Sequence, residues 1–303
     1  MYKKVLVPLD GSELAEVALV YAKEVASKLR LSLVLLHVYS SAEAELVPAR
    51  QAYINSKVDT IRRELKAETE AGIEPVSQEV TVRGELAKGY PAEEILRYAE
   101  ENSIDFILVS THGRTGIKLW TMGSVADKIL RASKVPIWLI RAGVPPEIAS
   151  DKWPTQRMLV LLDGSELAEA VLPHVETLTK QRGADLVDIV LLQVCEPTPF
   201  AVYYYSTVPI DWEDYIARCK REDEQHLAKI EKRLKDAGLK VRSELLMGKP
   251  ADAIIDYVGK NPVNLIVMST HGRSGLSRWV YGSVADKVLH GASTPIFLVR
   301  PRQ

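Results

Sequence analysis

The sequence predicts an α/β protein made of two tandem doubly wound domains, each a parallel sheet with helices on both faces. Three observations lead to this prediction. The chain has 303 residues, about twice the usual size of one domain. Two segments each occur twice, in the same order. Short apolar runs alternate with amphipathic stretches, which is typical of strands connected by crossover helices.

The internal repeat is defined by two anchors. Residues 10–16 (DGSELAE) recur letter for letter as residues 163–169. Residues 109–130 recur as residues 268–289, with two glycine positions and a following serine in the same places. Two anchors in one order, separated by the length of a whole domain, indicate duplicated domains and not a solenoid of short repeats.

The elements of the first copy follow from its apolar pattern. Runs rich in Val, Ile and Leu predict buried strands at residues 4–9, 31–38, 75–82, 106–109 and 136–140. Apolar residues at helical spacing predict helices at residues 13–29, 53–71, 92–100 and 123–132. The same alternation runs from residue 158 to residue 300. Right-handed crossovers between such strands give a mainly parallel sheet.

A linker is expected between the two copies. Residues 142–156 contain one glycine and three prolines, a composition that favours extended or turning backbone. We therefore predict a first domain over residues 1–143, a linker over residues 144–156 and a second domain over residues 157–303.

Charge and composition exclude several classes of protein. Lys plus Arg (39) nearly balance Asp plus Glu (40), and no basic block predicts a nucleic-acid partner. The apolar runs are shorter than the roughly 18 residues of a membrane helix, and the N-terminal residues do not resemble a signal peptide. We expect a cytoplasmic protein without membrane contact. Cys195 and Cys219 lack the spacing of a disulfide framework or a metal site.

The recurring segments begin where strands end, and ligands of parallel α/β sheets bind at the carboxyl ends of the strands. The two segments therefore share one crevice if the first and fourth strands are neighbours. In the second segment, Gly113 and Gly123 leave room for a close approach of the backbone. Ser124 follows at a helix start, where exposed N–H groups bind anions. The pattern predicts a phosphate-binding loop.

Ser124 and Asp10, one in each recurring segment, can each be interpreted in two ways. Ser124 is either a helix N-cap alone or a cap that also binds phosphate. Asp10 is either an acceptor for ribose hydroxyls or part of the N-terminal cap of the helix that begins after Ser12. Spacing alone does not decide between them.

The glycine loop also contains residues that invite a role in chemistry. His112 and His271 suggest a general base, but no nucleophile or carboxylate stands at an identifiable spacing, so we expect them to position the loop. Arg114 and Arg273 are candidate phosphate ligands, because a guanidinium suits that geometry, or solvated loop residues.

Both halves resemble the universal stress protein family, whose nucleotide-binding members carry the pattern G-x2-G-x9-G-(S/T). These places are taken by Ser110, Gly113, Gly123 and Ser124, and by Ser269, Gly272, Gly282 and Ser283. Only the first position departs, being serine in both halves, and we expect this change to be tolerated. The resemblance implies a five-stranded parallel sheet in the order 3-2-1-4-5, with adenine against the first two strands and phosphates on the loop before the fourth helix.

Carried over residue by residue, the resemblance implies two adenine nucleotide sites. The first consists of Pro8, Leu9, Asp10, Val38, Val109, Ser110, Gly113, Arg114, Gly123, Ser124 and Val125. The second consists of Leu161, Leu162, Asp163, Val194, Met268, Ser269, Gly272, Arg273, Gly282, Ser283 and Val284. The expected ligand is ATP, with or without Mg²⁺, and we predict no catalytic residue and no metal ligand.

The function implied is that of an ATP-binding protein in stress response or signalling. Two alternatives are a nucleotide-free oligomeric scaffold and a weak ATP-hydrolysing enzyme, although the GxxxxGK[ST] motif is absent. The resemblance also implies that the last strands pair between domains, giving an intramolecular pseudo-dimer and a homo-oligomer. The aromatic loop at residues 196–212 is a candidate lid over the second site.

Overall fold

The computed structural model describes residues 1–70, 80–111, 122–141, 156–196, 211–272 and 281–301. The chain divides into two compact units, Met1–Pro154 with Ser293–Arg300 and Thr155–Ala292 with Pro301–Gln303. The predicted linker falls almost entirely on residues 142–155, which lie outside the described residues. The predicted domain boundaries therefore stay predictions.

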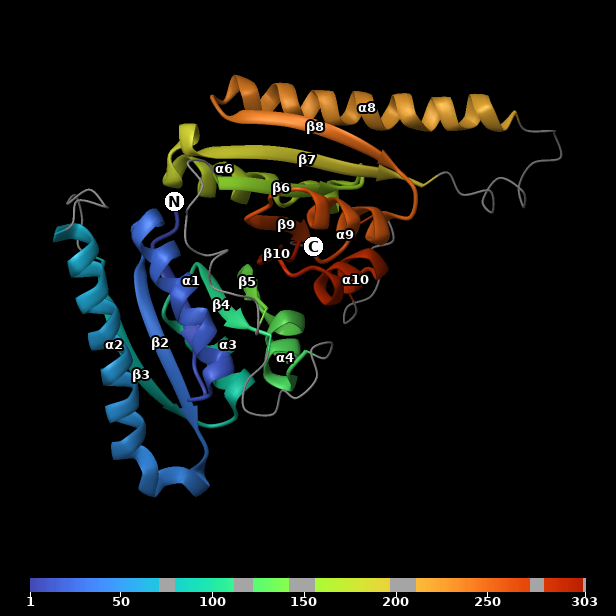
Figure 1. Cartoon of the computed structure of the whole chain (residues 1–303). Coiled ribbons are helices and arrows are strands. Elements are labelled where there is room, and N and C mark those ends of the chain that lie inside the picture. The colour runs from blue at the N-terminus through green and yellow to red at the C-terminus, as the bar shows by residue number, and fades with distance from the viewer. Residues whose placement is uncertain (71–79, 112–121, 142–155, 197–210, 273–280, 302–303) are drawn as a thin grey trace. The chain divides into compact units, whose positions relative to one another are not determined.

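The first unit alternates strands and helices (Figure 1). Its elements are β1 (Lys4–Pro8), α1 (Glu13–Leu29), β2 (Ser32–Tyr39), the 3₁₀ segment η1 (Ser41–Leu46), α2 (Val47–Glu70), β3 (Val82–Lys88), α3 (Pro91–Glu101), β4 (Phe106–Ser110), α4 (Ser124–Ala132) and β5 (Ile137–Ile140). The strand order β3-β2-β1-β4-β5, parallel throughout, confirms the predicted 3-2-1-4-5 order. Strands one and four are therefore neighbours.

The second unit repeats this plan. Its elements are β6 (Gln156–Leu162), α5 (Glu166–Glu169), α6 (Leu172–Arg182), the 3₁₀ segment η3 (Ala184–Leu186), β7 (Val187–Cys195), α8 (Trp212–Asp236), β8 (Lys240–Met247), α9 (Pro250–Lys260), β9 (Leu265–Ser269) and α10 (Ser283–Gly291). The strands β8-β7-β6-β9 lie in that order and are parallel. This matches strands three, two, one and four of the first unit.

The last strand of the chain belongs to the first unit. Strand β10 (Ile296–Val299) follows α10 in sequence, yet it lies within the first unit and pairs antiparallel with β5. Four aromatic side chains pack where these strands meet the core: Tyr2 on Phe106 at 5.3 Å, Phe106 on Trp138 at 5.9 Å, and Trp138 on Phe297 at 5.6 Å between ring centroids. Each such pair contributes about 0.5–1.5 kcal/mol beyond its buried area.

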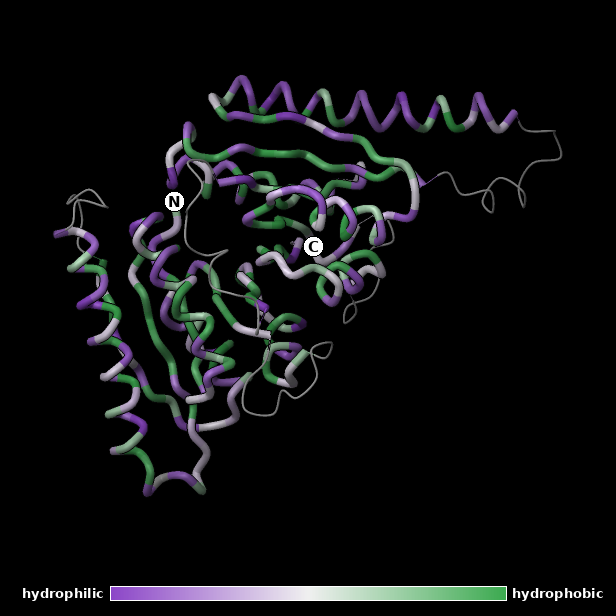
Figure 2. Tube along the Cα trace, in the orientation of Figure 1, coloured by the Kyte–Doolittle hydropathy of each residue, from purple (hydrophilic) through white to green (hydrophobic). Residues whose placement is uncertain are grey.

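The central strands form the apolar core. In β1 and β6 the residues Val5, Leu6, Leu159 and Val160 are completely buried, because helices cover both faces of a parallel sheet. Figure 2 shows hydrophobic colour along much of the neighbouring strands β2 and β7, and mostly hydrophilic colour on α8. Among the described residues, no helix is long and apolar enough to cross a membrane. A cytoplasmic location stays a prediction.

Two predicted elements of the first copy had wrong bounds. The strand predicted at residues 75–82 is β3, Val82–Lys88, and residues 75–79 lie outside the described part. β3 pairs with β2 alone among the strands of its unit, and such an edge strand carries charged residues instead of an apolar run. The helix predicted at residues 53–71 is α2, Val47–Glu70. Its first turn contains Pro48, a residue that is favoured at a helix start but is not part of the helical apolar pattern that begins at Tyr53.

The first helix is continuous in one copy and broken in the other. α1 runs unbroken over Glu13–Leu29, whereas α5 ends at Glu169 and α6 starts at Leu172. Pro173 stands in the first turn of α6. Proline has no N–H to donate and its ring clashes with the carbonyl four residues earlier, so a helix from Glu166 cannot continue past this point.

We predict opposite effects for two glycine-to-alanine changes. A Cβ on Gly84 of β3 would lie 2.1 Å from Ile54 Cγ2 of α2, so Gly84→Ala should destabilise the protein by about 1–3 kcal/mol. Gly259 in α9 has open space around that position, and Gly259→Ala should stabilise by about 0.5–1 kcal/mol because alanine is the better helix former. Urea unfolding of both variants measures this, and equal stabilities would contradict the α2–β3 packing.

Candidate functional site

The repeated heptapeptide forms the same turn in both units. Gly164 has φ +81°, a conformation that favours glycine. It lets Asp163 Oδ1 accept hydrogen bonds from the N–H of Ser165 at 3.0 Å and from its Oγ at 2.6 Å. Ser165 Oγ in turn accepts the N–H of Ala168 at 3.2 Å. The carboxylate is thereby fixed at the carboxyl end of β6.

The first unit has matching geometry. Gly11 has φ +84°, and Asp10 Oδ1 accepts from the N–H and Oγ of Ser12 at 2.9 and 2.6 Å. Ser12 is the N-cap of α1 and accepts from the N–H of Ala15. Asp10 therefore supports the helix cap without being the cap itself, and its predicted role toward ribose stays a prediction.

Gly272 connects the glycine motif to this turn. A Cβ built on Gly272 would lie 2.0 Å from Asp163 Oδ2, far inside any permitted contact. Only glycine allows the loop after β9 to approach the carboxylate after β6 this closely. The two recurring segments therefore converge on one crevice in the second unit, as the order of the strands predicted.

The third glycine of the motif closes the loop onto the strand end. Gly282 donates its N–H to the carbonyl of Thr270 at 3.0 Å, and its carbonyl accepts the first helical bond from Asp286 N at 2.9 Å. Gly282 is the N-cap of α10, and no side chain caps this helix. The N–H groups of Ser283, Val284 and Ala285 precede the first helical bond, so they have no acceptor within the helix.

The interpretation of Ser124 as an N-cap is wrong. The N-cap of α4 is Gly123, without a side-chain hydrogen bond, and Ser124 is the first helical residue. The cause is the same loop closure, because Gly123 donates to the carbonyl of Thr111 at 2.8 Å and accepts from Asp127 N at 2.9 Å. The predicted role of Ser124 in binding phosphate stays a prediction.

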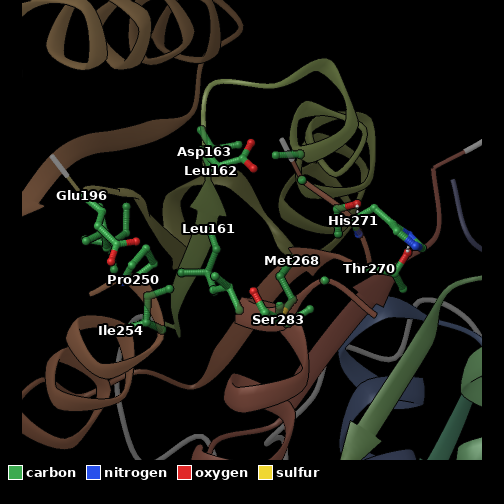
Figure 3. A pocket seen from close by; sticks show the side chains of 18 residues that line it. Leu161, Leu162, Asp163, Glu196, Pro250, Ile254, Met268, Thr270, His271 and Ser283 are labelled. Atoms are coloured by element: carbon green, nitrogen blue, oxygen red, sulfur yellow. Dashed lines mark hydrogen bonds between the residues drawn. The ribbon is translucent and has the colours of Figure 1, made fainter. Parts of the chain in front are cut away.

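A cavity of about 330 Å³ opens above these elements in the second unit, within the range of small-molecule sites. Figure 3 shows Glu196, Pro250 and Ile254 on one side of it and Thr270 and His271 on the other. The predicted residues that line it are Leu161, Leu162, Asp163, Val194, Met268, Ser269, Gly272, Gly282, Ser283 and Val284. Arg273 lies outside the described residues.

Some residues that line the cavity of the second unit were not predicted from the sequence. The further lining residues are Ala168, Leu192, Glu196, Pro250, Ile254, Thr270, His271 and Ala285. Ala285 follows the predicted Val284, and Ala168 lies in the repeated heptapeptide that begins at Asp163, so both stand close to predicted residues in the sequence. Pro250 and Ile254 lie on α9, and no motif marked that helix. His271 Nδ1 lies 2.8 Å from Thr270 Oγ1, which agrees with a loop-positioning role.

The first site is described in part. Pro8 ends β1 and is followed by Leu9 and Asp10, Val38 lies in β2, and Val109 and Ser110 end β4. Val125 follows Ser124 in α4. Gly113, Arg114 and His112 lie outside the described residues, as do residues 197–210 of the predicted lid.

The two motif serines differ in their bonding. Ser110 is 5% exposed, and its buried Oγ has no hydrogen-bond partner among the described residues. Ser269 Oγ accepts the N–H of His271 at 3.3 Å. A buried hydroxyl without a partner is costly, so Ser110 marks a place in the first unit where a polar ligand atom would be stabilising.

The described residues hold no group of three or more His, Cys, Asp or Glu side chains suited to a metal ion. Cys195 and Cys219 are not joined by a disulfide. Asp163 and Glu196 are the two carboxylates at the cavity, so the site combines acidic acceptors with backbone N–H donors. Carboxylate acceptors suit hydroxyl groups, and backbone N–H donors at a helix start suit an anionic group.

A sequence model of the universal stress protein family matches residues 1–141 and 154–300. The chain belongs to the universal stress protein family. A universal stress protein of Mycolicibacterium smegmatis is 23% identical over 305 residues, 98% of this chain and 97% of the relative. Another from Methanocaldococcus jannaschii, MJ0531, is 30% identical over 147 residues, which are 48% of this chain and 82% of the relative.

The fold agrees with this assignment. The crystal structure of a universal stress protein from Archaeoglobus fulgidus matches with a TM-score of 0.66 at 21% identity, over 98% of both chains. Two universal stress protein domains in tandem, each α/β with a mostly parallel sheet, are thereby confirmed for the chain.

Gly272→Ala should cost more than a change at the other motif glycine. Its Cβ would displace the Asp163 carboxylate, so we expect a loss of about 1–3 kcal/mol. A Cβ on Gly282 meets only the Thr270 carbonyl at 3.7 Å, an ordinary contact, and Gly282→Ala should cost less than Gly272→Ala. Thermal unfolding of both variants compares them, and a Gly272→Ala protein as stable as its parent would show that Asp163 is not held against the loop.

Proposed function

We propose that the protein binds an adenine nucleotide, ATP foremost, and that nucleotide occupancy changes the conformation presented to a partner. The observation that carries this proposal is the cavity of the second unit, where the open end of α10 and the Asp163 carboxylate meet apolar walls. Family membership agrees with it. The first unit, with the same turn and loop closure, is proposed as a second site.

The N–H groups at the start of α10 suit phosphate. Ser283, Val284 and Ala285 line the cavity, and a helix start offers both N–H donors and a favourable dipole to an anion. Each hydrogen bond to a charged group contributes about 1.5–3 kcal/mol. A few such bonds suffice for micromolar affinity, about −8.2 kcal/mol. Arg273 and Arg114 are proposed as further phosphate ligands.

The other walls suit a nucleoside. Leu161, Val194 and Met268 give the cavity an apolar surface on which a planar base packs. Asp163 accepts two hydrogen bonds from Ser165, and a carboxylate has about four lone-pair positions. We propose that the ribose hydroxyls donate to it. Hydrolysis of ATP is expected to be slow at most, because the described residues of the site offer no general base paired with a nucleophile.

Calorimetry with ATP, ADP, AMP and cyclic AMP, with and without Mg²⁺, tests this function directly. We expect micromolar binding of ATP to the purified full chain, with Mg²⁺ dependence read from the same titrations. Silent titrations, together with no nucleotide in a mass spectrum of extracted ligand, would contradict the proposal and leave the oligomeric scaffold as the alternative. The pseudo-dimer and the homo-oligomer stay predictions.

Gly282 permits a matched pair of variants that differ only in charge. Asp and Asn are both favoured N-caps, and the position has room for a side chain. Gly282→Asp should weaken ATP binding at the second site by about tenfold or more, since it places a negative charge where phosphate binds. Gly282→Asn should weaken it much less. Calorimetry measures both, and equal affinities at unchanged stability would contradict phosphate binding at α10.

Serine at the first motif position should be tolerated. Ser110→Gly removes one hydroxyl, whose hydrogen bond contributes about 0.5–1.5 kcal/mol, so the affinity for ATP should change by less than about tenfold. Ser269→Gly should have a smaller effect because Ser269 already bonds the His271 backbone. A nucleotide titration in which either change exceeded tenfold would show that the serine controls access to the loop.

A further inference from the structure

A polar chain lies behind the second cavity. Gln193 lies in β7 between Leu192 and Val194, which both line the cavity, and Glu169 follows Ala168, which lines it from α5. His226 of α8 lies between these two walls. Its Nδ1 is 3.2 Å from Gln193 Oε1 and its Nε2 is 3.0 Å from Glu169 Oε1.

Both partners of His226 present acceptor atoms. Gln193 Nε2 donates to Asp223 Oδ1 at 2.5 Å, which turns the amide oxygen toward His226, and Gln193 is 1% exposed. Rotating the amide would set its oxygen against the Asp223 carboxylate. A carboxylate and an amide oxygen only accept, so both contacts are hydrogen bonds when the imidazole carries two protons. A neutral ring makes one of them and places a lone pair against the other acceptor.

The ionisable side chains nearest the ring are carboxylates. Glu169 faces it from α5, and Asp223 lies on its own helix one turn away, coupled to it through Gln193. The charged residues of β8 are engaged elsewhere: Arg242 pairs with Glu244, and Lys240 donates to the carbonyl of Asp185. The side chains of His226 and Glu169 are 22% and 32% exposed, so the ring exchanges protons with solvent.

We propose that His226 is a positioning residue of the second nucleotide site, and that it holds the two cavity walls together when its ring carries both protons. This rests on the nucleotide-binding function proposed above. α5 is a single turn, cut off by Pro173, and so short a helix is not stable alone. The bond from His226 therefore fixes the helix that carries Ala168 and follows the Asp163 turn.

The first unit shows how the same glutamate is held without such a ring. Glu16, the equivalent of Glu169 in the repeated heptapeptide, accepts from Tyr53 Oη at 2.9 Å and from Lys57 Nζ at 2.6 Å. Tyrosine and lysine ordinarily carry their protons at neutral pH. Tyr53 of α2 thus takes the place that His226 of α8 has in the second unit, and it provides a natural template for a substitution.

The sign of the pH dependence follows from the hydrogen bonds. Histidine changes its charge between about pH 5 and 8. As the pH rises the ring loses its second proton, one wall loses its bond, and nucleotide affinity falls. Below the titration both bonds are present and affinity is highest.

The experiment compares histidine with tyrosine at this position at two pH values. Gly123→Asp is introduced to weaken the first site, as Gly282→Asp should weaken the second, and calorimetry with ATP then follows the second site at about pH 5.8 and about pH 8.0. With His226 we expect binding of ATP to be about three- to tenfold weaker at the higher pH than at the lower. With His226→Tyr we expect the affinities at the two pH values to differ by less than about twofold. Protonation of the ATP phosphates affects both proteins alike and cancels in the comparison.

A second variant and a spectroscopic measurement separate positioning from folding. Glu169→Gln keeps the volume of the side chain and supplies an amide N–H for the neutral ring, so it should flatten the pH profile without loss of stability. Nitrogen chemical shifts of the His226 ring, identified by their loss in His226→Tyr, should show both nitrogens protonated at about pH 5.8.

Each outcome bears on one claim. ATP binding with the same ratio of affinities in the His226→Tyr protein and in its parent overturns this inference and leaves the proposed function in place. A ring with a single proton at the lower pH overturns it as well. No heat with ATP at either pH in any of the proteins removes the proposed function, and this inference with it.

Discussion

The contact between the Asp163 carboxylate and the backbone of Gly272 is the constraint on which the second site depends. It joins the turn after β6 to the loop after β9, and it exists only because residue 272 has no Cβ. Once these segments touch, the loop closes through the Gly282–Thr270 hydrogen bond and α10 starts with its N–H groups at the cavity. The packing of one glycine therefore helps to set where these N–H groups lie.

Much of this arrangement was predictable because it depends on local rules. The alternation of apolar runs and amphipathic stretches gave the parallel sheet, and the position of the two repeated segments after strands placed them at one sheet edge. The residues that the resemblance assigned to the second site line one cavity wherever the structure describes them. Positive φ at Gly11 and Gly164 is what a glycine after aspartate at a strand end suggests.

The remainder was not predictable because it depends on tertiary packing or on weak local signals. β3 is an edge strand whose sequence is mixed, so no apolar run marks it. α2 begins with Val47, Pro48 and Ala49, which are partly or fully exposed, so no buried apolar pattern marks its start. Pro250 and Ile254 reach the cavity from α9 only because of how that helix lies on the sheet, and no spacing in the sequence reports this. The break between α5 and α6 was indicated in the sequence by Pro173. The identical heptapeptides favoured the expectation of one continuous helix in both copies.

Identical motifs do not make identical sites, because the residues that support a motif come from elsewhere in the chain. The heptapeptide ends in glutamate in both copies, yet Tyr53 and Lys57 hold it in one unit and His226 in the other. The unit whose first helix is continuous anchors that glutamate through a phenol and an ammonium group. The unit whose helix is cut to a single turn anchors it through an imidazole. A duplicated domain can thus keep one binding geometry and acquire two different responses to the surrounding solution, through changes in helices that carry none of the motif.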